Sequence, residues 1–192
     1  MYKRVTLRDT VEVPPEHLAE VTPDLVKKLL QDKLEGRVDE DVGSVVSVVD
    51  VHEIGEGAVV PNEPGVYYEA EFDAVTFDPQ MQEVIDGEIV EVVDFGAFVG
   101  IGPVDGLLHV SQISDEYLAY DGENQQLASR DTNRTIGTGD AVRARIVTKS
   151  IDERNPRDSK IGLTAKQIGL GKHGWLQEDR EKRQKQAEAG ES

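Results

Sequence analysis

The chain has 192 residues, with 38 acidic and 21 basic side chains, and its formal net charge is −17. It contains no cysteine, which excludes disulfides, thiolate metal sites and cysteine nucleophiles. No apolar run is long enough to span a membrane, and the first ten residues lack the apolar region of a signal peptide, so we expect a soluble cytoplasmic protein of one or two domains.

Residues 1–80 predict an α+β domain, a small antiparallel sheet with a covering helix. A strand is expected over Tyr2–Val13, stopped by two prolines, and a short helical turn over residues 15–20. Thr22 and Pro23 are a typical N-cap and first helical residue, and Gly36 ends the helix. Its apolar residues recur at helical spacing at Leu25, Val26, Leu29, Leu30 and Leu34.

Two further strands are expected over residues 42–54 and Val66–Phe77, with glycines at 55 and 57 breaking the first. The loop between them, residues 54–65, carries Val59 and Val60. Exposed apolar loop tips mark contacts with partners. The alternative is that both valines fold back onto their own sheet.

A domain boundary is expected at residues 78–80, followed by a barrel domain over residues 81–170 and a charged tail over 171–192. Short strands are predicted within 87–111, over 140–152 and over 160–165, with a charged turn at 153–159 and a long polar loop at 115–138 before the fourth strand. Five strands in this Greek-key order are typical of an all-β OB-fold barrel. We expect the tail to be partly disordered or a solvated helix.

Flat side chains gather in the glycine-rich segment 87–111, where Phe95, Phe98 and His109 lie. Residues three apart face opposite sides of a regular strand, but a bulge at Gly96 would bring both phenylalanines to one face. Aromatic rings on one face of a small barrel stack single-stranded bases. The alternative is that both rings belong to the core.

The charge is unevenly spread: residues 38–129 carry 21 acidic side chains and no lysine or arginine, whereas residues 130–192 carry 14 basic and 10 acidic ones. This excludes a broad basic surface for a phosphate backbone. The acidic middle is either a docking surface for a basic partner or an adaptation to a salt-loaded cell, and its diffuse spread favours the second. At molar salt the Debye length is about 3 Å, so nucleic-acid binding would depend on stacking.

No catalytic constellation is found. The four histidines lack metal-ligand spacing, and no nucleophile and base can be paired. We therefore expect a binding protein without cofactor or metal.

The segment from Gly87 to Ser111, together with Gly139-Asp140, Ile151-Asp152 and the closing KIGLT, resembles the RNA-binding OB-fold repeat named after ribosomal protein S-one. The resemblance covers roughly residues 82–166. It implies an RNA face made by Phe95, Phe98, His109, Asp152 and Lys160, with lysine at a position where the family more often has arginine. We add Arg143 and Arg145, which are spaced along the strand at 140–152.

The whole chain resembles a narrower family, the larger stalk subunits (E-prime) of archaeal DNA-directed RNA polymerase, counterparts of the seventh subunit of eukaryotic polymerase II. The resemblance lies in MYKRVTLRDTVEVPP, LVKKLLQDKLEGRV, HEIGEGAVVPNEPGVYYEAEF and GLGKHGW. The acidic composition suggests a haloarchaeon.

This family resemblance implies a non-catalytic subunit that pairs with the small F-type stalk subunit of RNA polymerase. It would bind nascent single-stranded RNA and assist open-complex formation and processivity. It would dock on the polymerase core near the clamp through Ile54, Gly55, Gly57, Val59, Val60 and Pro61. The alternative is an RNA-binding accessory subunit of an RNA-degrading complex such as the exosome.

Overall fold

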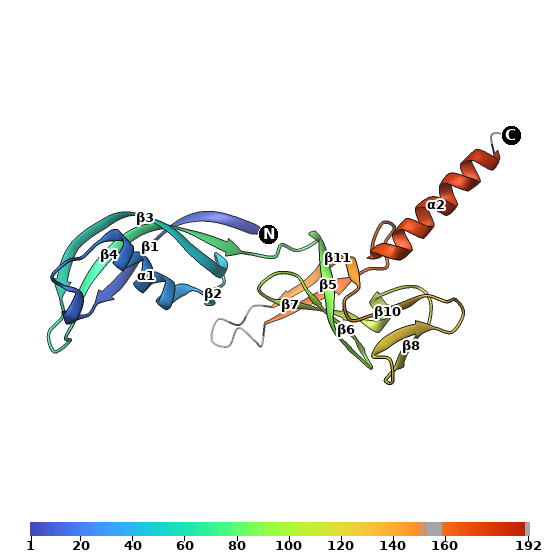
Figure 1. Ribbon diagram of the computed structural model, residues 1–192, viewed down its shortest axis with the longest axis horizontal. Helices are drawn as coiled ribbons and strands as arrows, with labels where there is room; N and C mark the ends of the chain where they lie inside the picture. Colours follow the sequence, from blue (N-terminus) through green and yellow to red (C-terminus); the bar gives the residue numbers. More distant parts are fainter. Residues whose placement is uncertain (151, 153–158, 191–192) are drawn as a thin grey trace. The chain divides into compact units, whose positions relative to one another are not determined.

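The computed structural model describes residues 1–150, 152 and 159–190. The chain divides into two compact units, Met1–Asp78 and a second unit made by Pro79–Ser150 with Ser159–Ser192 (Figure 1). The residues 151 and 153–158, which include most of the expected charged turn, lie outside the described part.

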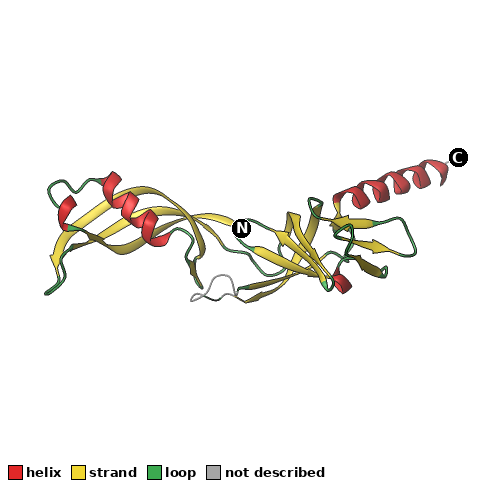
Figure 2. Ribbon diagram, turned by 60° about the horizontal axis from the view of Figure 1, so that its bottom comes forward, coloured by secondary structure: helices red, strands yellow, loops and turns green. Residues whose placement is uncertain are grey.

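The first unit is an antiparallel sheet with one helix on one face (Figure 2). Its strands are β1 (Tyr2–Val13), β2 (Val38–Asp39), β3 (Gly43–Val59) and β4 (Val66–Phe77), in the order β1-β4-β3-β2, and a 3₁₀ turn, η1, spans Pro15–His17. This confirms the predicted sheet and covering helix.

The helix α1 (Pro23–Leu34) forms where its caps and apolar spacing predict. The side chain of Thr22 accepts a hydrogen bond from the backbone N–H of Leu25, and Gly36 adopts a φ of 80° just after the helix. Val26 and Leu30 are fully buried and pack on the sheet. The core cluster they join consists of Val11, Val26, Leu30, Val45, Val48, Ala70, Phe72 and Ala74.

Strand β3 is longer than the sequence predicts and is repeatedly bulged. Its pairing with β4 shifts register four times between Val45 and Gly57. Each extra residue moves the side-chain alternation by one, so Val45, Val48, Val51 and Ile54, three residues apart, all face the core side. The expectation that Gly55 and Gly57 break the strand is wrong, because these glycines lie inside a bulged strand that continues to Val59.

The second unit is built on a closed barrel, which confirms the predicted OB fold. Its sheet has the order β12-β7-β6-β5-β11-β13, and β12 also pairs with β11. Buried residues such as Ile89, Val99, Leu108, Ile146 and Leu163 fill the interior. The strands are β5 (Val84–Val93), β6 (Gly96–Gly100), β7 (Asp105–His109), β11 (Ala141–Ser150), β12 (Lys160–Thr164) and β13 (Gly171–Lys172).

The segment 115–138, expected as a polar loop, is instead a small antiparallel sheet of β8 (Leu118–Asp121), β9 (Gln126–Ser129) and β10 (Thr135–Gly137). Each strand buries one apolar side chain, from Leu118, Leu127 and Ile136. A 3₁₀ turn, η2 (Val110–Gln112), joins β7 to this inserted sheet.

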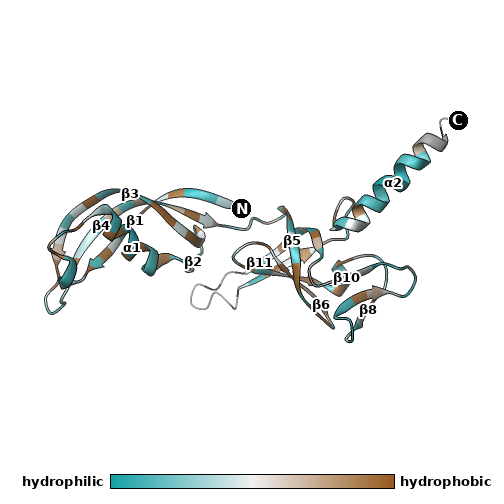
Figure 3. Ribbon diagram, in the orientation of Figure 1, coloured by the Kyte–Doolittle hydropathy of each residue, from teal (hydrophilic) through white to brown (hydrophobic). Residues whose placement is uncertain are grey.

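The charged tail is helical, as α2 (His173–Gly190). It is hydrophilic along most of its length, and Trp175 in its first turn is buried (Figure 3). Contacts of Trp175 and Asp179 with Arg134 join the first turns of the helix to the segment that carries the inserted sheet.

Candidate nucleic-acid interface and docking tip

Phe95 and Phe98 lie against each other at one end of the barrel. Their ring centroids are 6.4 Å apart and the rings meet edge to face at 85°. Phe95 is 45% exposed, and Phe98 is half-buried. Neither ring is part of the buried core, so the structure favours two rings accessible from solvent.

The two rings reach one side for a different reason from the expected bulge at Gly96. Phe95 lies in the β5–β6 turn, outside the alternation of β6, and Gly96 pairs regularly with Val93 and with His109. The register shift in this pair of strands lies between Ile89 and Glu91 of β5. The role of Gly96 is close approach, because a Cβ atom there would clash with the backbone carbonyl of Leu108.

His109 ends β7 beside these rings. It pairs with Gly96, while Phe98 pairs with Leu107, so His109 and Phe98 are diagonal neighbours with side chains on one face. The Nδ1 atom of His109 lies 3.2 Å from the backbone N–H donor of Ser111, which fixes the ring as the cap of η2. The same Nδ1 atom lies 2.8 Å from Oγ of Ser111, so both contacts hold one edge of the ring.

Lys160 lies on the same outward face, farther from His109. It begins β12 and is exposed, and β12 runs parallel to β7 with Gly162 beside Leu107. Two strands and two residues separate Lys160 from Phe98, which corresponds to about 12 Å between Cα atoms. The predicted face thus has three flat side chains at one end and a cation at the other.

Arg143 is placed elsewhere on the barrel. Its guanidinium makes two hydrogen bonds to Asp86, at 2.7 and 3.0 Å, and His173 lies 3.0 Å from the same carboxylate. These partners, Arg143 first, lower the pKa of Asp86 to about 2. Arg143 pairs with Asp86 of β5, and Phe98 pairs with Glu91, five residues farther along the same strand. The fold therefore does not bring Arg143 to the rings.

The two other predicted contacts have separate settings. Arg145 is half-buried opposite Thr164, and its buried Nε atom has no hydrogen-bond partner among the described residues. Asp152 is half-buried, and residues 151 and 153 on either side of it lie outside the described part. The contribution of Arg145 and Asp152 to RNA binding remains a prediction.

The predicted docking tip lies at the end of the β3–β4 hairpin, with a turn at residues 60–65. Val59 is 75% exposed and Val60 39%, so neither valine is buried in the sheet that carries it. Ile54, in contrast, packs against the core cluster and belongs to the body of the sheet. The exposed apolar end that the sequence predicts is therefore shorter than residues 54–65.

Local contacts shape this tip. The backbone N–H of Glu63 donates to the carbonyl of Val60 at 3.2 Å. A hydrogen bond with Glu63, aided by the nearby Glu12 carboxylate, raises the pKa of Tyr67 to about 12. A Cβ at Gly57 would lie 2.9 Å from the ring of Tyr68, so glycine allows this ring to cover the strand.

No group of three or more potential metal ligands is found among the described residues. No helix in the described part of the chain is long and apolar enough to cross a membrane. What the sequence missed is a basic cleft beside α2, for which the only signal was the excess of basic residues after residue 130.

Two family models match the two units. Residues 8–65 match the SHS2 domain found in the N terminus of Rpb7p/Rpc25p/MJ0397. Residues 78–160 match the S1 RNA binding domain.

Similar proteins cover nearly the whole chain. It is 35% identical over 180 residues to the DNA-directed RNA polymerase subunit Rpo7 of Sulfolobus acidocaldarius, covering 93% of this chain and 97% of that protein. The Rpo7 subunit of Saccharolobus solfataricus is 35% identical over 178 residues, which are 92% of this chain and 97% of the relative. A solved structure of Mycoplasma genitalium RNase R matches 44% of this chain and 13% of its own at 27% identity, with a TM-score of 0.37.

Proposed function

The chain belongs to the Rpo7 family of archaeal DNA-directed RNA polymerase subunits, and from this premise we propose how it acts. It is a stalk subunit that carries no active site of its own. The first unit anchors it to the polymerase core near the clamp, the small F-type stalk subunit is its partner, and the barrel holds nascent RNA. Through these contacts it assists open-complex formation and processivity. Family membership favours the polymerase over an RNA-degrading complex.

Anchoring is assigned to the end of the β3–β4 hairpin. Val59 presents an apolar side chain to solvent at the end of a long hairpin, and burial of such a side chain in a partner pocket contributes about 1.5–3 kcal/mol. The hydrogen-bonded turn below it lowers the conformational entropy lost on docking.

RNA binding is assigned to the rings of Phe95 and Phe98 with His109. The observation that carries this assignment is that both rings, 6.4 Å apart on the barrel that matches the S1 domain, lie outside the buried core, where bases could reach them. Stacking tolerates any base sequence, which suits a protein that holds whatever transcript emerges.

The experiment is capture of polymerase core by the subunit with Val59→Asp and Val60→Asp. Two carboxylates cannot enter an apolar pocket, so we expect loss of core binding. The control is Val84→Asp with Val90→Asp, two exposed β5 valines of the other unit, 39% and 46% exposed. Full-strength capture by the tip variant, in a folded protein, contradicts the docking assignment.

A further inference from the structure

A basic cleft opens beside the base of α2 in the second unit. It has a volume of about 380 Å³ and is bounded by residues 113–116, by residues 165–171 between β12 and β13, and by the first turns of α2. Its wall begins at Ile113, four residues after His109, so the Cα atoms of these residues are at most about 14 Å apart. The cleft therefore adjoins the end of the barrel where the rings lie.

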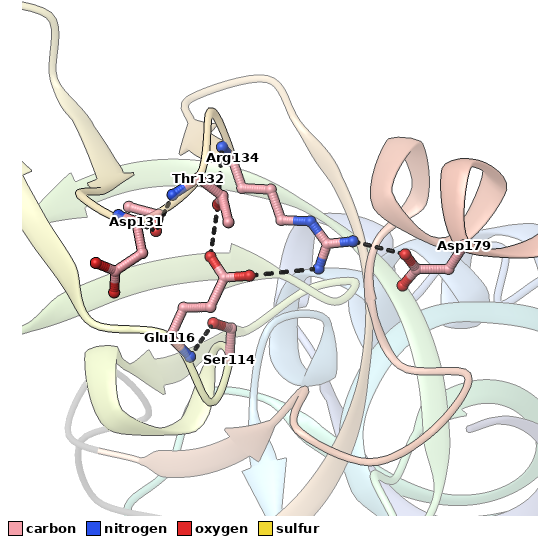
Figure 4. Close-up of polar contacts among 7 residues, drawn as sticks. Ser114, Glu116, Asp131, Thr132, Arg134 and Asp179 are labelled. Atoms are coloured by element: carbon pink, nitrogen blue, oxygen red, sulfur yellow. Dashed lines mark hydrogen bonds and ion pairs between the residues drawn. The ribbon is translucent and has the colours of Figure 1, made fainter. Parts of the chain in front are cut away.

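Arg134 holds the helical wall of this cleft in place (Figure 4). Its Nη2 atom lies 2.6 Å from Oδ1 of Asp179, and its guanidinium lies over the ring of Trp175 at 5.5 Å. On the other side Glu116 approaches Nη1 at 3.9 Å and accepts a hydrogen bond from Thr132 at 2.6 Å. Two carboxylates neutralise Arg134, so it ties α2 to the inserted sheet and is not itself a ligand-binding cation.

Two other cations in the cleft lack such partners. Arg180 and Arg183 lie three residues apart, on one side of α2, and both line the cleft. Neither side chain makes an ion pair or hydrogen bond with any residue that the structure describes, whereas Lys166 across the cleft lies 3.2 Å from Asp115. In a chain with a net charge of −17, two unneutralised guanidinium groups in one cleft indicate an anionic ligand.

We propose that this cleft binds the phosphate backbone of single-stranded RNA that continues from the ring face, with Arg180 and Arg183 as the contacts. The inference rests on the proposed RNA-binding function and extends it to a second contact area. The cleft adjoins the barrel end that carries the rings, and this favours RNA over an acidic protein segment as the ligand. The cleft floor is joined to the barrel end by Gln112, which accepts hydrogen bonds from the Ala165 backbone at 2.8 Å and from the Thr164 side chain at 2.9 Å.

The test is RNA affinity of the full chain carrying Arg180→Ala and Arg183→Ala, measured by fluorescence anisotropy over a range of potassium chloride concentrations. The control, Lys182→Ala with Lys185→Ala, removes two charges from the same helix outside the cleft. RNAs of about 4 and about 16 nucleotides bracket the site sizes of OB folds. The shorter RNA occupies the ring face alone, and the longer one also reaches the cleft.

For the longer RNA, we expect the magnitude of the slope of log affinity against log salt to be smaller by about 1.4 in the arginine variant than in the wild type. This difference corresponds to two phosphate contacts with a single strand. A fourfold rise in salt should then change the ratio of wild-type to variant affinity about sevenfold. The shorter RNA should bind both proteins equally, and the lysine control should keep the wild-type slope.

The cleft proposal is overturned if the arginine variant, shown to be folded by circular dichroism, keeps the wild-type slope with the longer RNA. It is also overturned if the lysine control loses as much slope, since the effect would then be one of net charge. Binding of polyglutamate in place of RNA would assign the cleft to an acidic protein. A Phe95→Ala and Phe98→Ala variant run in parallel separates the two claims: unchanged affinity for the shorter RNA in that variant contradicts the ring face itself.

Discussion

Truncation of both rings, Phe95→Ala with Phe98→Ala, should weaken RNA binding strongly and stability little. One stacked base contributes about 1–3 kcal/mol, and two rings in contact at 6.4 Å act as one platform with less than additive contributions. We therefore expect a loss of about 2–3 kcal/mol, roughly 30- to 150-fold in affinity. Because Phe95 is 45% exposed and Phe98 half-buried, the variant should remain folded.

The assay is fluorescence anisotropy with a short single-stranded RNA at low and at molar salt. Stacking does not depend on counterion release, so the fold-loss should be similar at both salt concentrations. The matched control is Tyr117→Ala with Tyr120→Ala, which removes two exposed aromatics of the inserted sheet, 66% and 42% exposed. Unchanged RNA affinity in the folded phenylalanine variant, or an equal loss in the tyrosine control, would refute the assignment to this ring pair.

Three further predictions concern stability. Gly57→Val should lower the free energy of unfolding by about 1–3 kcal/mol, seen by urea denaturation, because the new side chain overlaps the Val66 side chain and the Tyr68 ring; an unchanged midpoint would show that both can move aside. The pKa of Asp86 is lowered to about 2 by Arg143, so the stabilisation it gives is present above about pH 4 and lost as pH falls towards about 2. The Asp86→Asn variant should lack this acid-dependent loss of unfolding free energy, which is about 1 kcal/mol for a side chain that is 52% exposed. If the wild type and the variant lost the same stability in acid, the Arg143–Asp86 ion pair would be contradicted. The melting temperature should rise as potassium chloride approaches about 1 M, because salt screens the repulsion of a −17 chain, whereas a flat or falling profile would argue against salt adaptation.

Most of the first unit was predictable because its signals are local. The strands Tyr2–Val13 and Val66–Phe77 end where the sequence predicts, and the cap and proline at residues 22–23 mark the helix start. The continuation of β3 through Gly55 and Gly57 could not be predicted, because glycines in the local sequence favour a break in the strand. Pairing with β4, which accommodates the extra residues of β3 through four register shifts, overrides the local preference for a break.

The second unit shows the same division between local and tertiary signals. The barrel strands follow from apolar runs and from family resemblance, whereas β8, β9 and β10 have three or four residues each, too few for a periodic pattern. The engagement of Arg143 by Asp86 joins residues 57 positions apart, and nothing in the local sequence indicates it. The same is true of the contact between Arg134 and Asp179, on which the cleft depends.

Whether this chain works as a polymerase stalk subunit can be measured by affinity purification of the tagged chain from its native host at high salt, with every partner identified. We expect recovery of the large polymerase subunits together with a small stalk partner, and loss of the large subunits in the Val59→Asp and Val60→Asp variant. Recovery of phosphorolytic or ribosomal subunits without polymerase would contradict it.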